Sequence, residues 1–417
     1  MSASNGRGAG MIVIVGNGVA GIAAAEALRA GGCTDAITLL GDEAHPPYHR
    51  PPLSKAWLAG EMEAAQLQMR SPEALARKQI ELRPGVSVQA IDRARCEVTL
   101  SDGQVLAYTG LVLATGSTPR RLSLPGGDAP NVLALRSRDD AEAIAASMAQ
   151  GAAQGLPLVV IGGGFIGLEV AATARKKGLP VTVLEAAPRL LGRVLAPVLS
   201  DWYAALHTRH GVELVLNAQI SAIETTAGQA SAVLLADGRR LPCGLVLLGV
   251  GVTANDALAR AAGLATDRGI VVDECSRTAD PRIVAAGDCT ARRLPDGGLL
   301  RLESVQNATE QGRSAAAALL GQARPFTATP WFWSDQYDCK LQMAGLSAGA
   351  DEWAVRGDMA GTSFSVYHFR SGRLLAVDSV NAAKDHLTAR KLMDAGVLPT
   401  PAQAADVDLD LAAPLKP

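Results

Sequence analysis

The chain has 417 residues, with 39 lysines and arginines against 41 aspartates and glutamates, and a formal net charge of −2. This near-neutral balance provides no overall basic field of the kind that binds nucleic acid or anionic membranes, so we expect neither as a partner. The length is sufficient for about two to four domains.

The first residues and the longest apolar runs indicate where in the cell the protein is expected. The N-terminus is small and polar, without an apolar stretch behind a basic head, and runs such as 245–252 are far shorter than the roughly 18 residues of a membrane span. We therefore expect a soluble, cytoplasmic protein. The six cysteines form no CxxC or CxxxxC pair, so we expect buried thiols, with no redox disulfide and no metal site.

The first recurring pattern in chain order is a βαβ unit at 11–40. An apolar run at 11–16 ends in glycine, a helical stretch of small residues follows, and a second apolar run occupies 36–40. The same order returns about 145 residues later, at 156–184. Two such units predict two dinucleotide-binding folds in one chain.

Glycines mark the turn between the first strand and its helix. Gly16, Gly18 and Gly21 form a G-x-G-x-x-G turn, which lets a pyrophosphate approach backbone amides at the helix N-terminus. A carboxylate that accepts hydrogen bonds from the ribose hydroxyls is expected about 20 residues later. Asp42 is our candidate, and the adjacent Glu43 is the alternative.

The second unit repeats this turn and ends its second strand with Glu185. A carboxylate at this position hydrogen-bonds the 2′-hydroxyl of NADH and repels the 2′-phosphate of NADPH, so we expect NADH. Arg189 and Arg193 follow closely and could accommodate that phosphate, which leaves NADPH as the alternative. The residues assigned to the nicotinamide nucleotide are Gly162, Gly164, Phe165, Ile166, Gly167, Glu185, Arg193 and Gly251.

Breaker clusters and changes of composition set the expected domain boundaries. The strand-like runs at 245–249 and 283–286 both lead into glycines, which indicates a return to the first domain. From residue 328 tryptophans cluster between strand-like runs, and the last residues, 399–417, read as an extended tail. We expect a first nucleotide domain at 1–116 and 253–326, a second at 117–252, and an α+β domain with an extended tail at 327–417.

Two further motifs resemble those of a known superfamily. The segment 278–288, which ends in Gly287-Asp288, resembles the late FAD motif of pyridine nucleotide flavoprotein reductases, whose aspartate holds the ribityl chain of the flavin. Leu113-Ala114-Thr115-Gly116 resembles the crossing between their nucleotide domains. The chain is thereby identified as a member of the FAD-dependent pyridine nucleotide-disulfide oxidoreductase superfamily. This membership implies a glutathione-reductase-like α/β fold with two Rossmann-like domains, one resident FAD and one exchanging NADH.

The segment 50–58, RPPLSKAWL, indicates the subgroup. Disulfide reductases of the superfamily carry their redox cysteine at about this point, and this chain has none. The segment instead resembles the reductases of [2Fe–2S] ferredoxins, as do 303–305 and 330–336, although His49 and Gln306 depart from many relatives. The resemblance implies that electrons pass from NADH through FAD to a ferredoxin that serves a cytochrome monooxygenase or an aromatic-ring dioxygenase.

The resemblance also implies roles for individual residues. Lys55 is expected near flavin N5 and O4, where a cation stabilises the anionic reduced flavin, and Glu169 is expected to approach the nicotinamide and pair with Lys55. Glu169 could otherwise be an acid at a helix N-terminus, and Trp333 lies either at the flavin edge or in the core. The residues assigned to FAD are Gly16, Gly18, Ala20, Gly21, Asp42, Arg50, Lys55, Val88, Thr115, Gly116, Arg136, Asp288 and Val305.

A ferredoxin of this kind is usually acidic, so we expect a basic docking patch near the flavin edge, with Arg313 as a candidate. Arg50, Arg136 and Arg313 could also be ordinary solvated arginines. The alternative enzymes are a rubredoxin reductase and an oxygen-reducing NADH oxidase. A protein similar to apoptosis-inducing factor, with a structural flavin and a binding role, is the alternative of another class, and the net charge argues against it.

Overall fold

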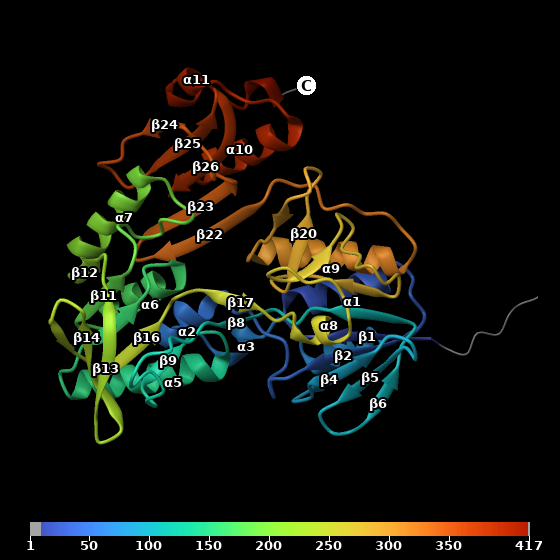
Figure 1. Ribbon diagram of the computed structural model, residues 1–417. Coiled ribbons are helices and arrows are strands. Elements are labelled where there is room, and N and C mark those ends of the chain that lie inside the picture. The colour runs from blue at the N-terminus through green and yellow to red at the C-terminus, as the bar shows by residue number, and fades with distance from the viewer. Residues whose placement is uncertain (1–9, 416–417) are drawn as a thin grey trace, which may run out of the picture. The chain divides into compact units, whose positions relative to one another are not determined.

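The computed structural model describes residues 10–415, which divide into two compact units (Figure 1). Unit 1 contains the described residues up to His49, together with Ala64–Thr118 and Thr253–Thr327. Unit 2 contains Arg50–Glu63, Pro119–Val252 and the described residues from Ala328 onward. Within residues 10–415 no helix is long and apolar enough to cross a membrane.

Unit 1 is built on a five-stranded parallel sheet of order β19-β7-β1-β2-β3. Its strands are β1 (Met11–Val15), β2 (Ala36–Gly41), β3 (Ile80–Pro84), β7 (Gly110–Leu113) and β19 (Ile283–Ala285). Ile12 and Ile14 of β1 pack beneath the helices on one face, and Val13 and Val15 pack on the other. Burial of both faces explains why β1 is apolar at every position.

Two helices, α1 (Val19–Ala30) and α9 (Val305–Leu319), lie side by side on one face of this sheet (Figure 1). They approach so closely that a Cβ on Gly312 of α9 would lie 2.5 Å from the carbonyl oxygen of Ala20. The opposite face is covered by the antiparallel strands β4 (Val88–Asp92), β5 (Glu97–Leu100) and β6 (Val105–Ala107).

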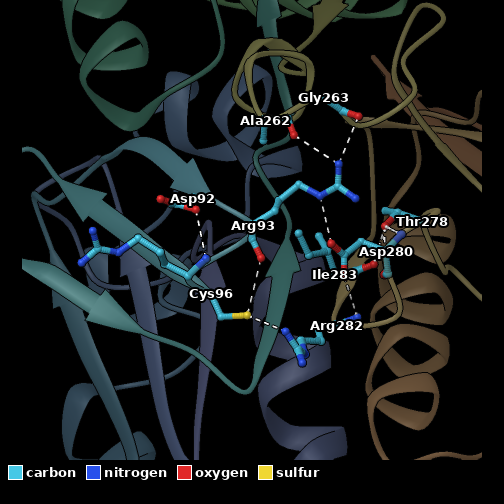
Figure 2. A network of polar contacts seen from close by, with 10 residues as sticks. Asp92, Arg93, Cys96, Ala262, Gly263, Thr278, Asp280, Arg282 and Ile283 are labelled. Atoms are coloured by element: carbon cyan, nitrogen blue, oxygen red, sulfur yellow. Dashed lines mark hydrogen bonds and ion pairs between the residues drawn. The ribbon is translucent and has the colours of Figure 1, made fainter.

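A polar network joins this antiparallel sheet to the late segment of unit 1 (Figure 2). Arg93 donates to Asp280 at 2.9 Å and to the carbonyl oxygens of Ala262 and Gly263. Segments about 170 to 190 positions apart are therefore held in one unit. The remaining elements of unit 1 are α3 (Ala64–Leu67), α4 (Pro72–Arg77), α8 (Ala257–Ala261), β18 (Ile270–Val272), β20 (Thr290–Arg293) and β21 (Leu299–Leu300).

Unit 2 contains a second five-stranded parallel sheet, of order β12-β11-β10-β16-β9. Its strands are β9 (Val132–Ala134), β10 (Leu158–Ile161), β11 (Val181–Glu185), β12 (Val212–Leu216) and β16 (Leu245–Leu248). The helices of this part are α5 (Arg138–Ala153), α6 (Phe165–Lys176) and α7 (Pro197–Arg209). An antiparallel sheet follows, with β13 (Ile220–Thr226), β14 (Gln229–Leu235) and β15 (Arg240–Pro242).

Two short elements from the early chain also belong to unit 2, namely η1 (Pro51–Ser54) and α2 (Ala56–Ala59), and both pack on α6. The hydroxyl of Thr173 on α6 donates to the carbonyl oxygen of Ser54 at 2.8 Å. Two further strands, β8 (Ser117–Pro119) and β17 (Val252–Ala254), lie where the chain passes from one unit to the other.

The C-terminal part of unit 2 is an antiparallel sheet of order β22-β23-β26-β25-β24. The strands are β22 (Trp331–Gln336), β23 (Cys339–Gly345), β24 (Glu352–Gly357), β25 (Phe364–Arg370) and β26 (Arg373–Val380). The helix α10 (Ala383–Ala395) packs on this sheet (Figure 1).

The expected extended tail is wrong for the described residues after 399. The chain forms a short helix, α11 (Pro401–Ala405), and a 3₁₀ turn, η2 (Ala413–Leu415). Thr400 and Gln403 make a reciprocal capping box with Pro401 at the first helical position, which favours a helix start. Leu411 is 8% exposed within the local core, so the tail is packed.

His386 on α10 is 1% exposed and its Nδ1 has no hydrogen-bond partner. Its ring lies edge-on to Trp331, with 6.1 Å between centroids. Burial, with a smaller contribution from Arg390, lowers the pKa of His386 from 6.5 to about 4. The folded chain therefore keeps this imidazole neutral in a pH range where the unfolded chain protonates it.

Replacing His386 with phenylalanine is expected to reduce the acid sensitivity of unit 2. Stability linked to His386 is fully present above the unfolded pKa of 6.5 and is lost as the pH falls toward 4. Urea unfolding at pH 7 and pH 5 should show that His386→Phe loses about 2 kcal/mol less than the wild type. The partly exposed His45 provides the control His45→Phe, and equal losses in His386→Phe and wild type would contradict this assignment.

Candidate functional site

The first glycine turn gives each of its glycines a separate role. Gly16 has φ +110°, and a Cβ there would lie 2.1 Å from the carbonyl oxygen of Ala114. A Cβ on Gly21 would lie 1.9 Å from the carbonyl oxygen of Gly16, so this glycine lets α1 pack against the turn. Gly18 faces open space, with nothing within 4 Å of its Cβ position, and no side chain caps α1.

The second turn repeats this arrangement. Gly162 has φ +109°, and its Cβ would lie 2.4 Å from the carbonyl oxygen of Gly249, while that of Gly167 would lie 2.3 Å from Gly162. At Gly164 the nearest atom is 3.8 Å away, and α6 also begins without a side-chain cap. Each unit thus has uncapped helix N–H groups beside an open glycine, a cradle that fits a dinucleotide pyrophosphate.

Backbone groups of the second glycine turn and of the loop after β11 together hold Glu185. Its two carboxylate oxygens accept from the N–H groups of Gly163 and Ala187, both at 2.7 Å. Each oxygen keeps a lone pair for a ribose hydroxyl. Arg189 is bound within the loop, because its guanidinium donates to the carbonyl oxygens of Leu195 and Gly192 and to the hydroxyl of Ser200.

The other nicotinamide-nucleotide candidates lie around the start of α6. Ile166 is an exposed apolar residue, at 40% of its surface, and Phe165 packs on Phe332 with 4.9 Å between ring centroids. Arg193 is exposed and lies beside Gly251, where a Cβ would be 3.4 Å from its guanidinium nitrogen. Of the two arginines considered for a 2′-phosphate, Arg189 is thus engaged with the loop and Arg193 lies at the surface.

The carboxylates after β2 differ in their surroundings. Asp42 is exposed, whereas Glu43 is partly buried and accepts a short hydrogen bond from Tyr48. The exposed side chain has more freedom to meet a ribose, although both acids remain candidates.

The Gly287-Asp288 turn of unit 1 is held by a residue that the sequence did not single out. Gln311 of α9, 2% exposed, accepts from the backbone N–H of Gly287 at 2.8 Å and from the hydroxyl of Thr290 at 2.9 Å. Asp288 accepts from Ser117 at 3.1 Å. A glutamine inside a helix carries no motif signal, so only the three-dimensional contact identifies it.

The remaining FAD candidates of unit 1 occupy varied positions. Ala20 lies between the close approaches of Gly287 and α9, Val88 is partly buried in β4, and Val305 is the first residue of α9.

Asn255 is a second residue that the sequence did not single out. It accepts from the Thr115 hydroxyl at 2.6 Å, donates to the Thr115 carbonyl at 2.9 Å, and its backbone N–H donates to Gly116.

Three FAD candidates, Arg50, Lys55 and Arg136, belong to unit 2, whereas the others belong to unit 1. Arg50 donates to the carbonyl oxygen of Arg136 at 2.8 Å. Trp333 is partly exposed on β22 and lies 5.6 Å from Trp331 between ring centroids.

Lys55 and Glu169 form an ion pair of 2.6 Å with side-chain exposures of 20% and 5%. Ser54 donates to the same carboxylate oxygen of Glu169 at 2.5 Å, and Ser334 of β22 donates to the other oxygen at 2.6 Å. The sequence suggested the pairing of Lys55 with Glu169 but neither serine. The three donors replace hydrogen bonds to water that this carboxylate loses on burial.

Arg313 lies on the rim of a surface hollow of about 620 Å³ in unit 1, between α1 and α9. The charged residues that line this hollow are Arg70, Arg313, Arg324 and Glu26. Arg313 and Arg324 are 47% and 52% exposed, and both contact Glu310, which is only 26% exposed. The rim therefore presents more positive than negative charge to solvent.

The chain matches known proteins along almost its whole length. The family described as pyridine nucleotide-disulphide oxidoreductase matches residues 10–312, and the family described as reductase C-terminal matches 331–415. Rhodocoxin reductase of Rhodococcus erythropolis is 47% identical over 96% of this chain and 93% of the relative. Putidaredoxin reductase CamA of Pseudomonas putida is 48% identical over 89% of this chain and 88% of the relative.

A solved structure, the covalent putidaredoxin reductase–putidaredoxin complex, has 43% identity and a TM-score of 0.92, and covers 98% of this chain and 99% of that chain. The resemblance drawn from the sequence and the expected glutathione-reductase-like fold with a C-terminal domain are confirmed. The expected cofactors, FAD and NADH, are those of this family.

Alanine substitutions at two glycines should separate packing from cofactor binding. Gly18→Ala adds a methyl group to open space, so we expect unchanged stability of the apoprotein but a loss of FAD affinity of at least about tenfold, because the methyl occupies the pyrophosphate approach. Gly21→Ala forces α1 away from Gly16 and should lower the melting temperature of the apoprotein itself. Thermal unfolding and FAD titration distinguish these effects, and full FAD affinity in Gly18→Ala would exclude this cradle.

Proposed function

Because this chain belongs to the pyridine nucleotide-disulphide oxidoreductase family, we propose that it is an NADH-dependent ferredoxin reductase. It passes electrons from NADH through FAD to a [2Fe–2S] ferredoxin, which serves a cytochrome monooxygenase or an aromatic-ring dioxygenase. The observation that carries this function is the pair of glycine cradles, one in each unit, together with the buried Lys55–Glu169 pair. We place the reaction in the cytoplasm, where thiols such as the six free cysteines persist.

We assign the cradle of unit 1 to FAD and that of unit 2 to NADH. FAD bound in the cradle of unit 1 would supply the chemistry that takes up a hydride and gives out single electrons. We keep the domain bounds expected from the sequence, with 1–116 and 253–326 for FAD, 117–252 for NADH and 327–417 as the C-terminal domain. Within the first range, the segment 50–63 packs in unit 2. Glu185 supports NADH, because its fixed carboxylate repels a 2′-phosphate and Arg189 is occupied by the loop.

Lys55 and Glu169 contribute to hydride transfer through their opposite charges. Lys55 would supply a cation to offset negative charge on bound FAD, and Glu169 keeps the ammonium group in place through a 2.6 Å hydrogen bond. Asp288 and Arg50 are assigned to the ribityl and pyrophosphate groups. Trp333 is assigned to the flavin edge.

The ferredoxin partner is assigned to the hollow between α1 and α9. Its arginines, including Arg313, complement an acidic protein surface, and its apolar lining can be buried by a partner. The covalent complex of a relative, putidaredoxin reductase, with putidaredoxin supports a ferredoxin as the partner.

Anaerobic stopped-flow mixing tests the function and the cofactor choice together. NADH should bleach the flavin band rapidly, and NADPH should do so at least about tenfold more slowly because Glu185 repels its 2′-phosphate. Steady-state rates with ferredoxin, rubredoxin and oxygen then identify the acceptor. Failure of both nucleotides to bleach the flavin would reject the reductase function, and full turnover on oxygen alone would reject the ferredoxin assignment.

Reversing a charge at the hollow should weaken ferredoxin docking without changing the reaction of the enzyme with NADH. With putidaredoxin as the test ferredoxin, Arg313→Glu should raise KM by about tenfold and reduce its salt dependence, because an attractive contact becomes repulsive. The rate of flavin reduction by NADH should not change. Arg95→Glu is the matched control, since Arg95 is a 71% exposed arginine of unit 1 that does not line the hollow. Equal KM values in both variants would place docking elsewhere.

A further inference from the structure

Behind the Lys55–Glu169 pair, a series of buried polar residues connects Glu169 to the surface of unit 2. On β22 the alternating residues Phe332, Ser334 and Gln336 share one face. Phe332 contacts Phe165, Ser334 contacts Glu169, and Gln336 contacts His207 of α7. Ser334, Gln336 and His207 are each no more than 1% exposed, so this strand face forms a polar seam inside the unit.

The distances describe one continuous series of hydrogen bonds. Ser334 Oγ is 2.6 Å from Glu169 Oε1, and Gln336 Nε2 is 3.1 Å from Ser334 Oγ. His207 Nε2 is 2.8 Å from Gln336 Oε1, and Tyr337 Oη is 3.2 Å from His207 Nδ1. The series starts at Tyr337, which is partly exposed, and ends at the carboxylate beside Lys55.

The charge on Glu169 fixes the direction of every bond. A carboxylate only accepts, so Ser334 must give it its single proton and can then only accept from Gln336. Gln336 must therefore turn its NH₂ group to Ser334 and its oxygen to His207. His207 must carry its proton on Nε2, so its Nδ1 must accept the proton of Tyr337.

The surroundings of His207 favour that neutral form. Burial lowers the pKa of His207 to about 4, against the raising effect of its hydrogen bond to Gln336 and with a smaller lowering contribution from His210. The turn after β22 places the Tyr337 hydroxyl beside His207. Tyr337 has φ +57° in this turn, and its ring stacks on the exposed His210 with 3.6 Å between centroids. Burial thus keeps the ring neutral at neutral pH, and the hydrogen bonds to Gln336 and Tyr337 select its tautomer.

We propose that Tyr337, His207, Gln336 and Ser334 form a one-way hydrogen-bond chain that orients the Glu169 carboxylate and so positions Lys55 for the hydride step. This inference rests on the proposed function of the Lys55–Glu169 pair. Hydrogen bonds that all point the same way polarise one another, so the last donor, Ser334, is stronger than an isolated hydroxyl. None of these four residues touches the reacting atoms in this scheme, and all are positioning residues.

The test uses the FAD-loaded protein and anaerobic stopped-flow reduction by NADH. Ser334→Ala removes the last donor, and we expect the limiting rate of flavin reduction to fall by about tenfold, the effect of losing one hydrogen bond to a charged group. The dissociation constant for NADH should change less than about twofold, because the cradle of α6 is intact. Ser334→Thr keeps the hydroxyl and should restore most of the rate.

A second variant addresses the direction of the chain. Gln336→Glu is nearly isosteric, but its carboxylate competes with Glu169 for the one proton of Ser334, so the limiting rate should again fall with little change in NADH binding. Ser365→Ala is the matched control, because Ser365 is also fully buried in the C-terminal sheet but bonds Ser379 and Asp385.

The outcomes separate this inference from the proposed function. If NADH does not bleach even the wild-type flavin, the reductase function fails. If the wild type is bleached and Ser334→Ala and Gln336→Glu both reduce as fast as Ser365→Ala, the positioning chain is rejected. Loss of NADH affinity in proportion to rate would also reject it, since a chain that only positions Lys55 leaves binding unchanged.

Discussion

A buried carboxylate organises the part of unit 2 where the proposed chemistry is prepared. Glu169 is only 5% exposed, and burying an ionised carboxylate is costly unless donors surround it. The donors come from two distant stretches of sequence, since Ser54 and Lys55 precede Glu169 by more than a hundred residues and Ser334 follows it by 165. Satisfying one side chain thus keeps the early segment 50–63 and strand β22 against the same helix.

The sequence predicted those features that depend on residues close together in the chain. Apolar runs ending in glycine revealed both parallel sheets, and the G-x-G-x-x-G turns located the two cradles. The pairing of Lys55 with Glu169 came from a family resemblance, because no local pattern brings residues 114 positions apart together. The polar face of β22 follows from its period of two, but what that face contacts does not. The partner of Gln336, His207, lies on another helix and was visible only in the fold.

The residues that the sequence did not reveal are mainly buried polar residues outside the motifs. Gln311 and Asn255 hold turns that the motifs did identify, yet a glutamine in a helix and an asparagine after a strand have no distinctive spacing. The tail was mistaken for an extended segment because its alanines and prolines were weighed by composition. The local capping signal of Thr400 and Gln403 was the better guide, since reciprocal bonds at a helix start outweigh composition over so short a stretch.

The loop after β11 has a consequence for how coenzyme preference can evolve. Glu185 accepts two backbone hydrogen bonds, and Arg189 closes the same loop through three further contacts. A mutation that removes the carboxylate to admit a 2′-phosphate also removes its bond to the loop at Ala187 and its bond to the glycine turn at Gly163. If Glu185 selects the coenzyme as proposed, discrimination and local rigidity are inherited together, and a lineage that changes its coenzyme must rebuild this region by coupled substitutions.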